Sequence, residues 1–385
     1  MACPSCGSTR TIKSASDRRK CLAPDHTGPR TYNIEREVAE AEVAEAIEAK
    51  QGHAPEHDMR HTVPAGYMVK GVSTLYGPNG EVRGQWVKSA QDAEAMQAVM
   101  LAAGQAFAST LPQVEPRKPN GAAWLDKLMA CYPIGDAHVG MLSWPAETGE
   151  AWDLEIAERI QCGAMAALVD GAPAAEQAVI VNLGDWFHAD NMDGVTTRSG
   201  HSLDMDGRYA KMIGVGIKVM RQCIESGLTK HKTVRVINVI GNHDDTGALW
   251  LSAALSHIYE REPRVLIDAS PAPFNYFRHG KTLVGCHHGH TCKPDKLPGV
   301  MAADRSEDWG QTTHRYWWLG HVHHQSVKEY PGVSVETFGT LAAKDAYATA
   351  GGWRARRDMK CIVLHEEHGE VARHTVNPAM LASAA

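Results

Sequence analysis

Five short motifs rich in Gly, His and Asp, each following a short apolar run, constrain the fold of this chain most strongly. In chain order they are Gly135-Asp136-Ala137-His138, Gly184-Asp185-Trp186-Phe187-His188, Gly241-Asn242-His243-Asp244, His287-His288-Gly289-His290 and Gly320-His321-Val322-His323-His324. In open α/β sheets, the loops at the carboxyl ends of the strands converge on one crevice. We therefore expect the five motifs to build one site.

The segments around these motifs alternate between apolar strands and amphipathic helices, which is typical of an α/β layered domain. The pattern predicts helices near Leu154–Val169, Arg208–Ser226 and Gly247–Tyr259. It predicts strands near Met129–Gly135, Ala178–Leu183, Thr233–Ile240, Thr282–Cys286, Tyr316–Leu319, Val333–Phe338 and Cys361–His365.

The donor atoms in the motifs are carboxylates, imidazoles and one carboxamide, a set that suits hard or borderline divalent cations. The chain holds 21 histidines in 385 residues, and His is the commonest side-chain metal ligand. Two cations about 3.5 to 4 Å apart stabilise both the attacking and the leaving oxygen of a displacement at phosphorus. The motifs therefore indicate a hydrolase of phosphate esters.

The order and spacing of the motifs resemble the calcineurin-like metallophosphoesterase superfamily, over roughly Ala130 to Leu341. The resemblance implies a four-layer β-sandwich flanked by helices. It implies one metal held by Asp136, His138, Asp185 and His323, and a second held by Asp185, Asn242, His288 and His321. His243 would then contact the phosphate and protonate the leaving oxygen or stabilise its charge. His287 and His290 remain alternatives to His288, which is favoured because family ligands at this place tend to precede Gly.

The second motif is similar to that of SbcD-type DNA repair exonucleases, which carry a His three positions after the bridging Asp. On that likeness, His188 helps to position a phosphodiester or assists proton transfer. The chain lacks room after the fifth motif for the capping and ATPase-binding regions of that branch, so dependence on an ATPase partner stays open. The whole arrangement also resembles metallophosphoesterases encoded in bacteriophage replication regions.

The first thirty residues predict a zinc-ribbon-like knuckle. Cys3 and Cys6 have the two-residue spacing of a zinc knuckle, and Cys21 and His26 could complete a tetrahedral structural site. The second half departs from the ribbon pattern, so Asp25 or no fourth protein ligand remains an alternative. The basic side chains around these cysteines suit contacts to phosphates.

Between the knuckle and the α/β domain, residues 31–120 predict a small α+β module. It comprises a solvated helix over Asn33–Lys50, a hairpin around Gly77-Pro78-Asn79-Gly80, a helix near Gln91–Ser109 and a linker at Leu111–Gly121. We therefore expect three domains: 1–30, 31–120 and 121–385.

We expect a dinuclear-metal phosphodiesterase, a DNA exonuclease or endonuclease that hydrolyses its substrate with a metal-bridging hydroxide. Manganese is favoured, with iron, zinc or magnesium as alternatives. A phosphatase or cyclic-nucleotide or other small-molecule phosphodiesterase is one competing hypothesis, and a non-catalytic DNA-binding subunit is another. RNA remains an alternative substrate, and a replication or repair protein could be a further partner.

The remaining sequence features concern charge and location. The net charge of −6 argues against indiscriminate coating of nucleic acid but allows a local basic patch. Trp353 lies among Arg354, Arg356 and Arg357, which suits either a nucleic-acid strand or a surface charge cluster. No apolar run is long enough to span a membrane, and no export signal is evident, so we expect a cytoplasmic protein.

Overall fold

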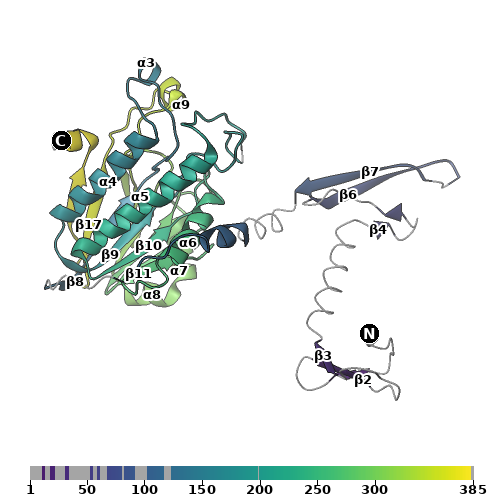
Figure 1. The fold of residues 1–385 in the computed structure, drawn as a ribbon, viewed down its shortest axis with the longest axis horizontal. Coiled ribbons are helices and arrows are strands. Elements are labelled where there is room, and N and C mark those ends of the chain that lie inside the picture. The colour runs from purple at the N-terminus through teal and green to yellow at the C-terminus, as the bar shows by residue number, and fades with distance from the viewer. Residues whose placement is uncertain are drawn as a thin grey trace. The chain divides into compact units, whose positions relative to one another are not determined.

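The computed structural model describes residues 67–79, 82–91, 102–116, 123–197 and 199–382, and the backbone of short strands at 11–13, 18–21, 31–33, 53–54 and 59–60. The chain divides into two compact units, Met1–Val99 and Met100–Ala385. Figure 1 shows the elements of both units along the chain. No helix in the described part of the chain is long and apolar enough to cross a bilayer.

The described part of the first unit consists of short antiparallel pairings. Strands β1 (Thr11–Lys13), β2 (Arg18–Cys21) and β3 (Thr31–Asn33) form one sheet, β4 (His53–Ala54) pairs with β5 (Met59–Arg60), and β6 (Tyr67–Tyr76) pairs with β7 (Val82–Gln91). The hairpin expected around Gly77–Gly80 is therefore present as β6 and β7.

The expected zinc knuckle and the helix over residues 33–50 are not tested by the structure. Cys3, Cys6 and His26 lie outside the described residues, as do residues 34–50, and of Cys21 only the backbone is described, at the end of β2. The zinc site of the first thirty residues stays a prediction.

The second unit contains a six-stranded and a five-stranded sheet. The six-stranded sheet has the order β11 (Val265–Asp268), β10 (Thr233–Asn238), β9 (Ala175–Asn182), β8 (Leu125–Ile134), β17 (Met359–His365) and β18 (Gly369–Val376). Strands β8 to β11 are parallel, because helices α4 (Leu154–Gly171), α5 (Tyr209–Lys230) and α6 (Gly247–Ile258) provide their crossover connections. Strands β17 and β18 are added antiparallel.

The five-stranded sheet has the order β12 (Asn275–His279), β13 (Thr282–His287), β14 (His314–Leu319), β16 (Val333–Thr337) and β15 (Ser326–Tyr330). Its three central strands are parallel, and both edge strands are antiparallel to their neighbours. Short helices α7 (Leu297–Asp304) and α8 (Ser306–Gln311) connect β13 to β14, and α3 (Pro145–Thr148), α9 (Ala346–Ala350) and α10 (Pro378–Ala382) complete the unit.

Three groups of buried apolar side chains show that the second unit has four layers. One group joins the facing sides of the two sheets, with Val181 and Ile362 of the first sheet packed among Val284 and Trp318 of the second. A second group lies under α4, α5 and α6 on the outer face of the six-stranded sheet. The third lies under α7 on the outer face of the five-stranded sheet. The expected α/β class is confirmed, and Figure 1 shows α4 and α5 lying across the first sheet.

The second unit begins before residue 121, where the sequence analysis places its start. A helix at 102–108 and the segment after it pack against the α/β layers, since Ala108 and Val114 are buried in the same core as α6. The Val114 N–H also donates to the Ile258 carbonyl oxygen over 2.6 Å. The segment that reads as a linker in sequence is therefore partly core.

Candidate metal centre

The five motifs follow the carboxyl ends of β8, β9, β10, β13 and β14, the central strands of the two sheets. The first two lie on neighbouring parallel strands, as do the second and third, and the fourth and fifth lie on a neighbouring pair in the other sheet. Because the two sheets face each other, the loops from both meet at one edge of the sandwich.

The backbone at the motifs adopts an uncommon conformation. Among the described residues other than glycine, five have a positive φ angle: Asp136 (41°), His138 (43°), Asp185 (53°), His321 (71°) and His323 (54°). All five are residues that the sequence analysis assigns to metal binding. Left-handed backbone at non-glycine residues costs free energy and concentrates at functional sites, where the surrounding structure maintains it.

The first group of donor atoms belongs to Asp136, His138 and His323, whose ligand atoms lie within 4.8 Å of one another. His323 Nε2 lies 3.4 Å from Asp136 Oδ1 and 3.1 Å from His138 Nε2. The Asp136 carboxylate is fully buried and accepts the His321 backbone N–H through both oxygens, at 2.8 and 3.0 Å. This hydrogen bond connects the first motif to the fifth.

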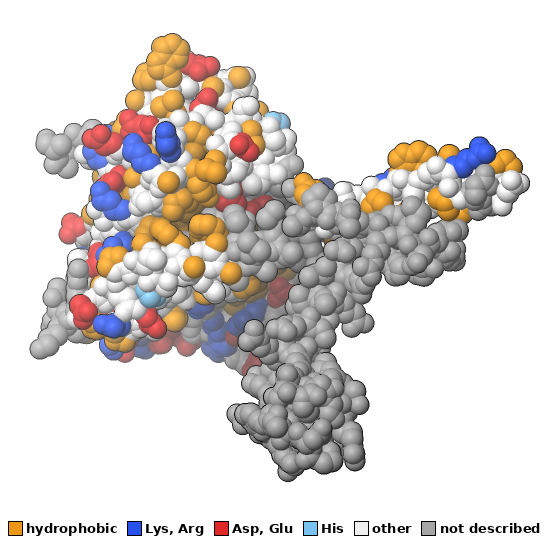
Figure 2. All heavy atoms as spheres, turned by 45° about the vertical axis from the view of Figure 1, so that its right-hand side comes forward, with side chains coloured by type: hydrophobic (Ala, Val, Ile, Leu, Met, Phe, Trp, Pro, Cys, Tyr) orange, Lys and Arg blue, Asp and Glu red, His pale blue; other side chains and the backbone are white. Residues whose placement is uncertain are grey.

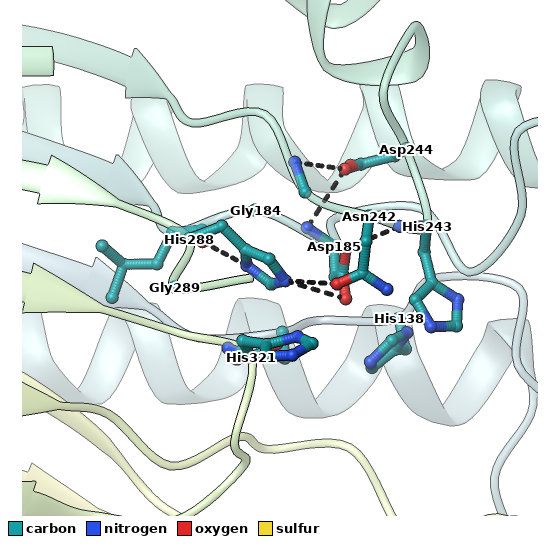
Figure 3. A network of polar contacts seen from close by, with 12 residues as sticks. His138, Gly184, Asp185, Asn242, His243, Asp244, His288, Gly289 and His321 are labelled. Atoms are coloured by element: carbon teal, nitrogen blue, oxygen red, sulfur yellow. Dashed lines mark hydrogen bonds and ion pairs between the residues drawn. The ribbon is translucent and has the colours of Figure 1, made fainter. Parts of the chain in front are cut away.

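The second group belongs to Asp185, His288 and His321, with Asn242 beside it. His288 Nε2 lies 3.2 Å from Asp185 Oδ2 and 3.0 Å from Asn242 Oδ1, and its Nδ1 donates to the Leu183 carbonyl oxygen over 2.8 Å. Figure 3 shows the His288 ring pointing between Asp185 and Asn242, with the His321 ring below it. The Nδ1–H bond fixes the tautomer so that Nε2 is free to act as a ligand.

His188 and His243 form a third group with His138. His188 Nδ1 lies 3.2 Å from His138 Nδ1, and the His188 ring stacks on the His243 ring with centroids 5.5 Å apart. His243 Nδ1 donates to the His188 carbonyl oxygen over 2.8 Å. The buried His188 Nε2 has no hydrogen-bond partner among the described residues.

These residues fit two divalent cations on the chemistry of their donors. Burial lowers the pKa of His138 well below its usual value, with His243 and His323 lowering it further, so the imidazole is neutral and able to coordinate. Burial, followed by His243, likewise lowers the pKa of His188 to about 3. Imidazole nitrogens that face each other at 3.1 Å, with carboxylate oxygens alongside, form an arrangement that a cation between them would stabilise.

Asp185 and His288 form a buried electrostatic pair. Burial opposes ionisation of Asp185, yet the neighbouring His288 holds the pKa of this carboxyl well below its usual range. Burial also opposes protonation of His288, yet Asp185 raises the pKa of its imidazole to about 10. Without a metal the two side chains form an ion pair, and binding a cation to His288 Nε2 displaces its proton.

Asp244 has a role that the sequence analysis does not assign. Its buried carboxylate accepts four backbone N–H groups, those of Gly241 and Asp185 through Oδ1 and those of Trp186 and Phe187 through Oδ2, at 2.8 to 3.2 Å. The His243 N–H in turn donates to Asp185 Oδ1 over 2.9 Å. The second and third motifs are thus joined by hydrogen bonds from main-chain N–H groups to the carboxylates of Asp244 and Asp185. No sequence spacing reveals these bonds, because they depend on two loops meeting in space.

Gly241 and Gly184 permit the close approach of these loops. A Cβ atom on Gly241 would lie 2.1 Å from Asp185 Oδ1, and one on Gly184, whose φ is +94°, would lie 2.6 Å from His288 Nδ1. Neither position has room for a side chain. The recurrence of Gly beside the donors therefore has a steric cause at these two positions.

The structure separates the three histidines of the fourth motif. His288 contributes to the second donor group, whereas His287 Nε2 is bonded to Thr291 Oγ1 and its ring stacks on Phe274 at 4.7 Å. The His290 ring lies near the site, with its centroid 5.2 Å from that of His288 and 6.2 Å from that of His321. Its position makes it a neighbour of the second donor group.

No family model matches this chain, and no curated protein matches it. Solved structures resemble it over most of their own length. A conserved uncharacterized protein (predicted phosphoesterase) from Streptococcus pneumoniae TIGR4 is 11% identical, with 65% of this chain and 97% of that chain covered and a TM-score of 0.27. Vps29 complexed with zinc from Entamoeba histolytica is 14% identical, with coverages of 64% and 98% and a TM-score of 0.26.

Phosphopantetheinyl hydrolase from Mycobacterium tuberculosis is 10% identical, with 56% of this chain and 91% of that chain covered and a TM-score of 0.27.

Proposed function

We propose that this protein is a metal-dependent phosphodiesterase and that its substrate is DNA. The observation that carries the proposal is the convergence of two donor groups on adjoining loops, with His138 in the first, Asp185 in the second, and the His188 and His243 imidazoles beside His138. Two divalent cations bound there supply Lewis-acid activation of water and of the phosphate oxygens. Manganese suits this mixed oxygen and nitrogen donor set.

The ligands divide between two cations. Asp136, His138 and His323 would hold one of them, His288, His321 and Asn242 would hold the other, and Asp185 would serve both. Apart from Asn242 and the shared Asp185, the division follows the two donor groups, each of which gathers ligand atoms from both sheets within 4.8 Å. Neutral imidazoles and ionised carboxylates are the forms that coordinate at neutral pH.

His243 is the proposed general acid. Its Nδ1–H is occupied by the His188 carbonyl oxygen, so Nε2 is the atom that can carry a proton to the leaving oxygen. The side chain is half-buried at the edge of the donor groups, where a bound phosphate ester could reach it. A proton delivered there neutralises the leaving alkoxide.

His188 supports the choice of a nuclease. Its Nδ1 lies 3.2 Å from His138 Nδ1, so the buried His188 side chain acts on the substrate through the ring that it positions. A phosphodiester that bridges two nucleosides extends on both sides of the reacting phosphorus, so additional donors around the phosphate favour its correct placement. We also propose that the N-terminal Cys3, Cys6, Cys21 and His26 hold a structural zinc that adds affinity for DNA.

The test compares the wild type with His243→Ala and with His368→Ala, an exposed imidazole at the turn between β17 and β18. Each protein is loaded with manganese and incubated with end-labelled single- and double-stranded DNA and with bis-p-nitrophenyl phosphate. Loss of the general acid should slow DNA cleavage by roughly 100-fold or more, and His368→Ala should cleave like the wild type.

If the wild type hydrolyses bis-p-nitrophenyl phosphate but leaves DNA intact, the phosphodiesterase stands and the DNA substrate is wrong. If the wild type hydrolyses neither while metal analysis finds two bound ions, the proposed activity is wrong. The lengths of the labelled products would distinguish an exonuclease from an endonuclease.

A further inference from the structure

The loop that follows β16 carries two exposed aromatic side chains. Tyr347 on α9 is 66% exposed and Trp353 just after α9 is 57% exposed. Their rings meet edge to face, with centroids 5.2 Å apart and planes at 76°. Large aromatic side chains are normally buried, so two in mutual contact on the surface indicate a binding function.

The loop is firmly attached at its base. Arg357 donates through Nε and Nη2 to the Leu341 carbonyl oxygen at 2.9 and 2.6 Å, and through Nη1 to Glu150 Oε2 at 2.7 Å. The Asp345 side chain caps α9 by accepting the Ala348 N–H over 2.7 Å. The two rings therefore project from an ordered turn.

The same loop contacts the metal-binding motifs. Thr340 Oγ1 donates to the Asp136 carbonyl oxygen over 2.6 Å, and the His201 ring, in the loop after the second motif, lies 6.2 Å from the Tyr347 ring. Tyr347 is seven positions after Thr340, which limits the distance between them to about 25 Å. Figure 1 shows α9 beside α3 at one end of the domain, and Figure 2 shows hydrophobic side chains gathered at that end.

Two arginines follow the rings in the same loop, and the exposed Glu147 of the neighbouring α3 adds a negative charge. Arg354 and Arg356 are both exposed, and neither forms an ion pair with another described residue. The Arg354 guanidinium donates to the backbone carbonyl oxygens of Ala348, Thr349 and Trp353, which fixes its position while its charge remains uncompensated. The acidic Asp345 is occupied by the α9 N-terminus.

We infer that Tyr347 and Trp353, flanked by Arg354 and Arg356, form a stacking platform for the bases of a single-stranded segment of the substrate, beside the metal centre. The inference rests on the proposed phosphodiesterase function and specifies how the strand is held. Aromatic rings stack on any base, and cations beside them pair with the phosphates. A phosphate ester without a base could not stack on the rings.

The test measures binding, without metal and in the presence of chelator, by fluorescence anisotropy of labelled oligonucleotides with the full chain. The probes are an oligothymidylate of about 15 nucleotides and an abasic strand of the same length, which has the same phosphates and no bases. The variants are the double change Tyr347→Ala with Trp353→Ala, the conservative Trp353→Phe, and Leu266→Ala, an exposed side chain on edge strand β11, as control.

The double variant should bind oligothymidylate roughly 10- to 100-fold more weakly than the wild type, while both bind the abasic strand equally. Trp353→Phe should retain most of the wild-type affinity for oligothymidylate, and Leu266→Ala should bind as tightly as the wild type. Equal binding of the two strands by the wild type, or unchanged affinity in the double variant, would overturn the platform. A change in oligomeric state of the double variant by sedimentation, with unchanged DNA binding, would assign the rings to a second copy instead.

Hydrolysis of bis-p-nitrophenyl phosphate by the wild type keeps the two proposals apart. If the wild type lacks that activity but the double variant loses affinity for oligothymidylate, the platform stands and the phosphodiesterase is wrong.

Discussion

At the scale of single residues, glycine is required at the metal centre for space rather than for flexibility. A side chain on Gly241 would overlap Asp185, whereas Gly214 on α5 has open space around its Cα. Gly241→Ala should therefore greatly lower the free energy of unfolding, or prevent folding, and abolish metal binding. Gly214→Ala should stabilise it by about 0.5 to 1 kcal/mol, because alanine is the better helix former. Urea unfolding and metal analysis of both variants would check this pair.

His231 provides a pH-dependent contribution to stability away from the metal centre. It is fully buried, its Nδ1 donates to the Ala175 carbonyl oxygen over 2.9 Å, and its Nε2 lies 2.7 Å from the Tyr132 hydroxyl. Burial, followed by the charge of Lys230, lowers the pKa of this imidazole below its ordinary value of 6.5. The unfolded chain therefore binds a proton at this side chain more readily than the folded chain does.

The free energy of unfolding should consequently fall as the pH drops below 6.5, with a slope of at most about 1.4 kcal/mol per pH unit from this group. His231→Gln should show a shallower decrease between pH 7.5 and 5.5 than the wild type, whereas the exposed His368→Gln should parallel the wild type. Urea titrations across this range measure the slopes. Parallel slopes for wild type and His231→Gln would show that folding does not lower the pKa of His231.

From order and spacing along the chain, the sequence marks donor residues that the structure gathers into groups, and their binding of metal stays a prediction. It does not predict the function of Asp244, which depends on the amides of a loop more than fifty positions away meeting those of its own turn. Nor does it predict Asp190, which accepts the N–H groups of Thr246 and Gly247 at the start of α6. Both are carboxylates that accept backbone N–H groups. Because nearly every residue has such a group, residue types do not show which ones are bonded.

At the scale of secondary structure elements, the predictable strands are the central ones. All seven predicted strands are present, and the four in the second unit that the apolar pattern does not predict are β11, β12, β15 and β18. Each is an edge strand of its sheet. An edge strand is partly exposed, as in β15 where four of five residues are exposed, so it lacks the apolar run that marks a strand buried on both faces.

One pair of elements is held together across the two sheets by charge. Arg373 on β18 donates through Nη2 to Glu336 Oε2 on β16 over 2.8 Å, and Glu336 is only 5% exposed. Arg373→Met would leave this carboxylate buried without its cation, which should cost about 3 to 5 kcal/mol. Combining Arg373→Met with Glu336→Leu should recover most of that loss.

Urea unfolding measures all of these variants, with Lys127→Met as the control. Lys127 pairs with Glu366 at the surface, with side chains 62% and 37% exposed, so its loss should cost less than about 1 kcal/mol. Equal losses from Arg373→Met and Lys127→Met would mean that the link between the sheets adds nothing to stability.

At the scale of the whole molecule, the start of the α/β unit can be tested by truncation. A fragment of residues 100–385 retains Ala108 and Val114, which are buried in the core, whereas a fragment of residues 121–385 lacks both. The shorter fragment should be less stable by roughly 2 to 4 kcal/mol, because the apolar surface they cover becomes exposed. Urea unfolding of the two fragments would show this. Equal midpoints would place the start at residue 121.

The hydrogen bonds around Asp244 also bear on which ion the protein carries in a cell. The loops of the second and third motifs are joined by amide groups and a carboxylate, and these bonds do not involve the ligand atoms of His288 or His321. The loops of the second and third motifs would therefore keep their arrangement when a bound ion leaves. Replacement of one ion by another needs only dehydration and ligand exchange, with no refolding step. Occupancy should then follow both the supply of each divalent ion and the affinity of the site for it, so growth conditions would contribute to the metal content of the purified protein.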